Sequence, residues 1–244
     1  MAAVAVLSTV ADSPAGGYLS SAPTVTRGAT DQTCGRLGSM DWLCARSGAL
    51  TVRAPTASRS VIFRGHTPHR VASGTAVKTS SGSSGVITFA KDAICTIGSG
   101  FGATSLITRY GGNSLFLLRS GVTACTLSRN TGAAPHYACG GSCNLVVQAD
   151  GASFRTHSSN PIVIDGFQGR IRVRATDSSG TTGCDVTASG GTSNVRIAIH
   201  IKTTSTPNGV TIDISVDCEA NINVGFTKTD IAAFQQQRQL LGLG

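Results

Sequence analysis

The clearest pattern in the chain is the alternation of apolar and polar residues between Val195 and Cys218, interrupted by one loop. Alternation with a period of two places one set of side chains on each face of a β-strand. The loop contains Pro207-Asn208-Gly209, which supplies the fixed φ and the positive φ that a chain reversal needs. The pattern therefore predicts two antiparallel strands that share a dry, β-branched face and a polar face.

The polar face of this hairpin carries charges of opposite sign on its two strands. Arg196, His200 and Lys202 lie on the first strand, and Asp213 and Asp217 lie on the second. Such cross-strand pairs contribute about 0.2–1 kcal/mol each. A face of this kind suits water or a polar partner.

Short apolar segments separated by glycine-rich turns fill most of the chain after residue 85. Further strands are expected at 50–52, 60–63, 86–89, 93–97, 105–108, 114–118, 122–127, 144–148, 152–156, 162–164, 170–175 and 184–188. Helix formers are scarce, because Glu219 is the only glutamate in the sequence. We therefore predict an all-β fold, a multi-stranded sandwich or a solenoid-like sheet, although no repeat of fixed length is found.

The two ends of the chain differ from this pattern. Residues 1–33 are small and polar, which predicts an extended arm that a neighbouring subunit would order. Residues 34–228 form the expected β-rich domain, with a potential sub-boundary at the Ser/Gly-rich stretch 80–85. Residues 229–244 predict a helix and tail.

The expected C-terminal helix has an apolar face made by Ile231, Phe234 and Leu241, and Thr229-Asp230 offers a cap. A short helix of this composition is only marginally stable alone. We expect it to dock on the sheet or on a partner subunit.

Four segments between residues 74 and 127 together form a recognisable pattern. They are Gly74-Thr75-Ala76-Val77-Lys78-Thr79, Gly85-Val86-Ile87-Thr88-Phe89, Cys95-Thr96-Ile97-Gly98 and Leu115-Phe116-Leu117-Leu118-Arg119-Ser120-Gly121-Val122. This pattern resembles the FecR-type domain. The family runs from a Val-x-Thr strand to a closing Leu-x-x-Gly-x-Val strand. This chain has Lys91-Asp92-Ala93 where the family commonly has an Asp-Gly turn, and it lacks the family's membrane helix. The resemblance implies an extracytoplasmic β-rich interaction domain.

The formal net charge of +8 is carried mostly by arginine, which favours carboxylate and phosphate partners but also simply aids solubility. Arg170, Arg172 and Arg174 alternate with apolar residues and so share one strand face. This stripe is a candidate contact for an acidic protein, glycan or phosphate polymer, together with Arg196 and Lys202 of the hairpin. The alternative is a solvated face whose charges are matched by nearby acids. Those acids are Asp165, Asp177 and Asp185.

Eight cysteines are distributed through the chain, and we expect them to be disulfide partners or small core residues. They are Cys34, Cys44, Cys95, Cys125, Cys139, Cys143, Cys184 and Cys218. Disulfides would favour an oxidising compartment, a particle exterior or the cell exterior. His136-x-x-Cys139-x-x-x-Cys143 has a metal-like spacing, but no second pair completes a zinc site. A Cys139–Cys143 loop disulfide or two separate bridges are therefore preferred, and no metal or cofactor is expected.

The sequence predicts a non-catalytic protein. Gly98-Ser99-Gly100-Phe101-Gly102 lacks the Gly-Lys-Ser/Thr ending of a phosphate loop, and no nucleophile elbow is present. No apolar stretch reaches transmembrane length. The expected function is that of a structural or interaction subunit of a larger assembly, such as a virion, a surface layer or an accessory subunit, whose arm and helix reach onto neighbours. The alternative is a binding module that captures an anionic polymer, and either would be extracytoplasmic or particle-associated.

Overall fold

The computed structural model describes residues 20–21, 34, 41–72, 74–89, 92–98, 104–110, 113–128, 134–137, 144–158, 161–177 and 179–244. These residues form sixteen strands and one helix, which confirms the all-β fold with a short C-terminal helix. The expected arm lies outside the described residues except for Ser20–Ser21, which pairs with His69–Arg70 of the same chain.

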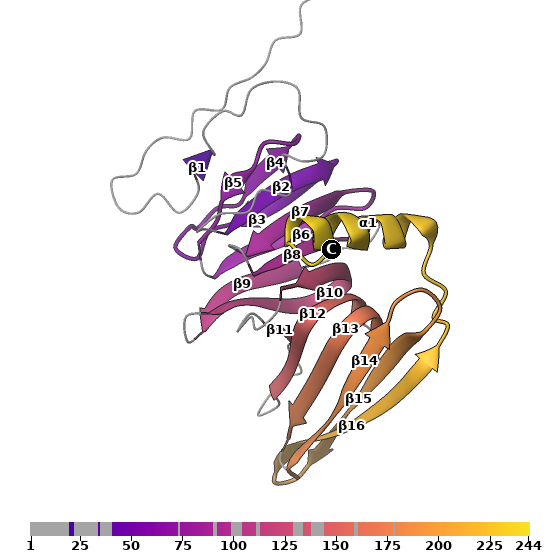
Figure 1. The fold of residues 1–244 in the computed structure, drawn as a ribbon. Coiled ribbons are helices and arrows are strands. Elements are labelled where there is room, and N and C mark those ends of the chain that lie inside the picture. The colour runs from indigo at the N-terminus through magenta and orange to yellow at the C-terminus, as the bar shows by residue number, and fades with distance from the viewer. Residues whose placement is uncertain are drawn as a thin grey trace, which may run out of the picture.

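The strands join into one hydrogen-bonded network, and they stack along one axis from β2–β5 at one end to β14–β16 at the other (Figure 1). The elements are β1 Ser20–Ser21, β2 Trp42–Ser47, β3 Ala49–Arg53, β4 Val61–Arg64, β5 His69–Arg70, β6 Thr75–Thr79, β7 Ser84–Phe89, β8 Ala93–Ile97, β9 Thr104–Tyr110, β10 Asn113–Leu127, β11 Ala134–Tyr137, β12 Asn144–Ser158, β13 Ile162–Thr176, β14 Thr181–Ser189, β15 Asn194–Thr206, β16 Gly209–Ile222 and α1 Lys228–Leu240.

Three long strands, β10, β12 and β13, connect two layers of this network. The second half of β10 pairs with β8, which leads on to β7 and β2, whereas its first half pairs with β9, which leads on to β6, β3 and β4. We call these the first and the second layer. Each layer extends across β12 and β13 to its own terminal strand, β16 in the first layer and β14 in the second. The molecule is thus a sandwich whose strands also stack as in a solenoid.

Glycines allow the long strands to pass from one layer to the other. The β12–β13 pairing shifts register between Asp150 and Ser153, where Gly151 and Gly169 have positive φ angles of 57° and 91°. A Cβ atom on Gly169 would lie 2.4 Å from the Gly151 carbonyl oxygen. The two backbones can approach this closely only because Gly169 has no side chain.

One hydrophobic core lies between the layers. It includes Val77 of β6 and Ile87 of β7, which lie on either side of the turn that joins Ser80 to Ser83. The apolar face predicted for the hairpin is confirmed in its first half, where Ile197 and Ile199 are fully buried.

The second half of that hairpin departs from the prediction of a dry face. Every residue from Lys202 to Thr211 is exposed, and Val210 retains 63% of its accessible surface. In this region β15 and β16 have left the sandwich and pair only with each other among the described residues. The alternation was read correctly as strands, but it does not show where the opposing layer ends.

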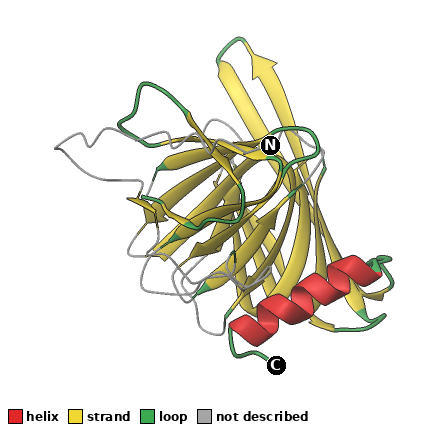
Figure 2. Cartoon of the chain, turned by 90° about the horizontal axis from the view of Figure 1, so that it is seen from above, coloured by secondary structure: helices red, strands yellow, loops and turns green. Residues whose placement is uncertain are grey.

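The helix α1 lies across the outer face of the first layer, near one end of its strands (Figure 2).

Candidate functional sites

The N-terminus of α1 is attached to the first layer by a charged cluster. Thr227 and Asp230 form a capping box, in which each side chain accepts a hydrogen bond from the other's backbone N–H. Arg155 of β12 donates to Asp230 at 3.1 Å and to Asp165 of β13, also at 3.1 Å. Arg196 of β15 donates its Nε to Asp165 at 2.8 Å. The cluster therefore connects three strands to the helix.

An aromatic group packs beside this cluster. Phe167, Phe226 and Phe234 lie with ring centroids 5.5–5.6 Å apart, and the Arg155 guanidinium lies 5.0 Å from the Phe226 ring centroid. Phe234 is fully buried, as expected for a docking residue, while Ile231 and Leu241 are half-buried.

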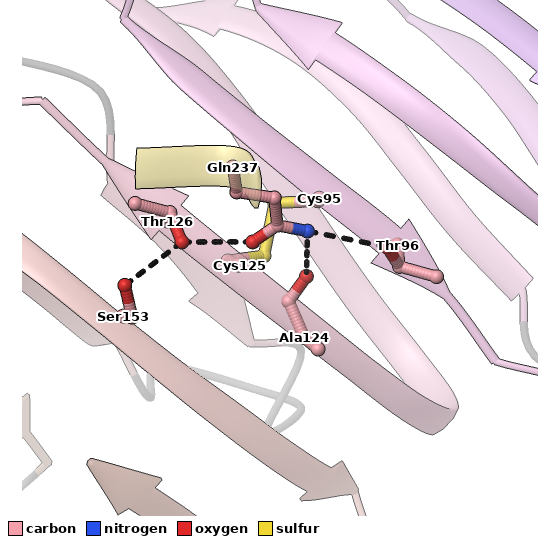
Figure 3. The surroundings of a disulfide bond; sticks show 7 residues. All are labelled: Cys95, Thr96, Ala124, Cys125, Thr126, Ser153 and Gln237. Atoms are coloured by element: carbon pink, nitrogen blue, oxygen red, sulfur yellow. Dashed lines mark hydrogen bonds between the residues drawn. A yellow bond between two sulfur atoms is a disulfide. The ribbon is translucent and has the colours of Figure 1, made fainter. Parts of the chain in front are cut away.

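A buried glutamine attaches the second half of α1 to the sheet (Figure 3). The Gln237 amide nitrogen donates to Thr96 Oγ1 at 3.2 Å and to the Ala124 carbonyl at 3.4 Å. Its amide oxygen accepts from Thr126 Oγ1 at 2.7 Å, and that hydroxyl also contacts Ser153 Oγ at 2.9 Å. The polar groups of the sheet beneath Gln237 are thus satisfied by hydrogen bonds, while Leu240 and Leu241 pack on an apolar cluster that contains Val86 and Ile94.

These contacts correct one part of the sequence interpretation. The face of α1 that carries Phe234 is covered by the chain's own sheet, so it cannot be the surface through which the helix reaches a neighbour. The helix was expected to dock either on the sheet or on a partner subunit, and in the structure it docks on the sheet of its own chain.

The arginine stripe of β13 is partly neutralised by one acid on β14. Arg170 donates to both oxygens of Asp185, at 2.7 and 2.6 Å, and Arg172 donates twice to Asp185 Oδ2, at 3.0 and 2.8 Å. Hydrogen bonds from Arg170, and then from Arg172, lower the pKa of Asp185 to about 2. Arg174 is exposed and lies opposite Gly183, where no side chain can pair with it. Capture of an anion by this stripe stays a prediction.

The two hairpin cations proposed as partner contacts lie in different surroundings. Arg196 is held by Asp165, whereas Lys202 is exposed and lies opposite Asp213 in the strand register. His200 Nε2 lies 3.2 Å from Asp217 Oδ2. The groove on this face is shallow and open, and its polar groups already face one another across the two strands.

Asp177, in the turn between β13 and β14, forms a contact that the sequence did not indicate. Its carboxylate accepts from Ser179, from the Gly180 N–H and, at 2.7 Å, from the Ile214 N–H of β16. The hydroxyl and N–H of Ser179, followed by the Ile214 N–H, lower the pKa of Asp177. The Asp-x-Ser-Gly sequence signals the turn, but nothing local signals the bond to a strand 37 residues away.

Three disulfides are present in the described residues, and they confirm that cysteines form bridges. They are Cys34–Cys44, Cys95–Cys125 and Cys184–Cys218. The first joins Cys34 to β2, the second lies in the core, and the third joins β14 to β16. Cys139 and Cys143 lie outside the described residues.

Within the described ranges, no three His, Cys, Asp or Glu side chains are grouped closely enough to hold a metal ion. α1 is too short and too polar to cross a membrane, and the part of the chain that the structure describes contains no other helix.

Comparison with protein-family models, with curated proteins and with solved structures gives no match to this chain. The resemblance to the FecR-type domain stays a prediction.

Proposed function

We propose that this chain is a non-catalytic interaction subunit of a larger assembly, and that the outer half of the β15–β16 hairpin is its contact element. We call the segment Lys202–Thr211 the ribbon. The observation that supports the proposal is the complete exposure of the ribbon's two paired strands.

An isolated two-stranded ribbon is at best marginally stable in water. The ribbon is also rich in Ser and Thr and carries Val210 largely exposed, with Lys202 as its one charged residue. Ser and Thr hydroxyls can be buried against a partner surface where they find hydrogen-bond partners on it. A partner that covers the ribbon would bury Val210 and order both strands.

The disulfides agree with a role outside the reducing cytosol. Cys184–Cys218 joins half-exposed Cys184 to exposed Cys218, where reductants could reach it. We therefore place the assembly in an oxidising compartment, at the cell exterior or on a particle.

Site-specific photo-crosslinking tests the proposal. A photoreactive residue replaces Thr204 on the ribbon, and the full chain is produced in the cells that normally make it. We expect illumination to give discrete cross-linked species in which the partner is the same protein in every preparation.

A matched control places the same photoreactive residue at Thr187, an exposed position on β14. The photoreactive residue at position 187 should give no discrete cross-linked species. Equal labelling from both positions, or no cross-linked protein from Thr204, would contradict the proposed role of the ribbon.

A further inference from the structure

The two ends of the strand stack each present a strand with an open edge. Within the described residues β4 pairs only with β3, and β16 pairs only with β15. Figure 1 places β4 and β16 at opposite ends of the molecule. Unpaired edges are templates for strand addition from another chain.

The open edge of β16 is limited to a short window. Asp177 occupies the Ile214 N–H, so the outward N–H and C=O groups of β16 belong to the even-numbered residues. Asn221 has a positive φ of 58°, which ends the regular strand. Between these two points Val216–Ala220 has no strand partner beyond β15 among the described residues, although Cys218 is bridged to Cys184 of β14. Its length fits the four residues of β4, Val61–Arg64.

The two edges carry opposite charge. From Trp42 to Lys91 the sequence contains no Asp or Glu, and Arg59 and Arg64 are exposed beside and on β4. The strand β16 contains no Lys or Arg, and Asp217 and Glu219 are exposed within its open window.

Charge already alternates between neighbouring strands at the β16 end. Arg196 lies opposite Glu219 in the strand register, and His200 contacts Asp217. A basic strand added beyond β16 would continue this alternation, because Glu219 would then have a cation on both sides. Pairing of β16 with a second β16 would instead place acid against acid, and two β4 edges would place arginine against arginine.

The strand β4 also exposes an apolar side chain. Ile62 keeps 59% of its accessible surface and lies on the same strand face as Arg64. Strand pairing would cover part of this surface.

We propose that copies of this chain associate head to tail, with β4 of one copy adding to the Val216–Ala220 edge of the next. The inference rests on the proposed assembly function and names a second copy as one partner. The contact is heterologous, since it joins two different surfaces. Each copy keeps a free β4 at one end and a free β16 at the other, so the association continues as an open chain.

Sedimentation velocity of the purified full chain tests this contact. At low salt the protein should form head-to-tail assemblies whose size increases with protein concentration. Added salt should make these assemblies smaller, because exposed charges are screened. Arg59→Glu with Arg64→Glu should weaken association roughly tenfold or more, and so should Asp217→Arg with Glu219→Arg.

Mixing the two double variants provides the decisive measurement. The reversed β4 of one variant then matches the reversed β16 of the other, and their unchanged ends also match. The mixture should again form assemblies that grow with concentration, and the two variants should alternate along each assembly. Arg174→Glu, which changes an exposed charge on the side of the stack, should leave association unchanged, and circular dichroism checks that every variant is folded.

A wild-type chain that remains monomeric at low salt, one that stops at a closed dimer, or a mixture that does not regain growth would overturn the head-to-tail contact. If the purified chain is monomeric but Thr204 still cross-links to another protein, the second-copy contact is wrong while the proposed function stands. If the chains grow but Thr204 gives no cross-link, the contact stands and the ribbon is not the contact element.

Discussion

At the scale of single residues, Asp165 is the acid on which several elements depend. Its side chain is 1% exposed and receives hydrogen bonds from Arg155 and Arg196. Such a carboxylate is tolerated in the interior only because both cations compensate for its lost hydration.

Replacing Asp165 by Asn should lower the free energy of unfolding by about 3 kcal/mol, because Arg155 would be left largely buried with one acid fewer. Urea unfolding measures the change. Asp185→Asn is the matched control, since its partners are solvent-exposed, and it should cost less than about 1 kcal/mol. Equal losses for the two variants would contradict the structural role of Asp165.

The Asp185 carboxyl should titrate with a pKa of about 2, mainly because Arg170 donates hydrogen bonds to its ionised form. The pKa in the unfolded chain is near 3.9, so the folded state favours the charged form. The resulting stability is present above about pH 4 and is lost as the pH falls toward 2. A carboxyl NMR titration checks the pKa, and Arg170→Gln should move it upward, whereas Arg174→Gln should not.

The sequence predicted which arginines share a face, but it could not assign their partners. Asp165, Asp177 and Asp185 are all near the arginine stripe in sequence, yet only Asp185 pairs with it. The β13–β14 register sets this choice by placing Asp185 opposite Arg172. A register depends on the turn and on both strands together, so the partner of a charge is not a local property.

At the scale of elements, α1 shows where helical periodicity is informative and where it is not. The apolar spacing correctly predicted a helix and the burial of Phe234. It did not predict that Gln237 is buried as well, because its partners Thr96 and Thr126 are 141 and 111 residues away. A polar residue is recognised as buried only once its distant hydrogen-bond partners are known.

Gln237→Ala should destabilise the protein by about 1–3 kcal/mol, because the hydroxyl of Thr126 and the carbonyl of Ala124 would lose a partner beneath the helix. Thermal or urea unfolding measures this loss. Gln235→Ala, on the exposed face of the same helix, should stay within about 0.5 kcal/mol of the wild type. A wild-type stability for Gln237→Ala would show that the helix does not depend on this contact.

At the scale of the whole molecule, local signals predicted strands but not how the layers are joined. Residues 144–148 and 152–156 were expected as separate strands, yet they form the single strand β12 that bends at Gly151. The same holds for β13, which bends near Gly169. A glycine that ends a strand and a glycine that bends one look alike in sequence, because both simply permit a positive φ.

The Cys184–Cys218 disulfide closes the sandwich at its β14–β16 end, where no further strand continues the core among the described residues. The bridge spans a sequence separation of 34 residues, so restricting the unfolded chain contributes about 3–4 kcal/mol. The double variant Cys184→Ser, Cys218→Ser should have a free energy of unfolding that is lower by this amount, as measured by urea unfolding. Hydrogen exchange should then accelerate in β14 and β16, while β7 and β8 at the middle of the stack keep their protection, because terminal strands open locally before the core does. Uniform acceleration across all strands would show instead that the bridge stabilises the whole sandwich as one unit.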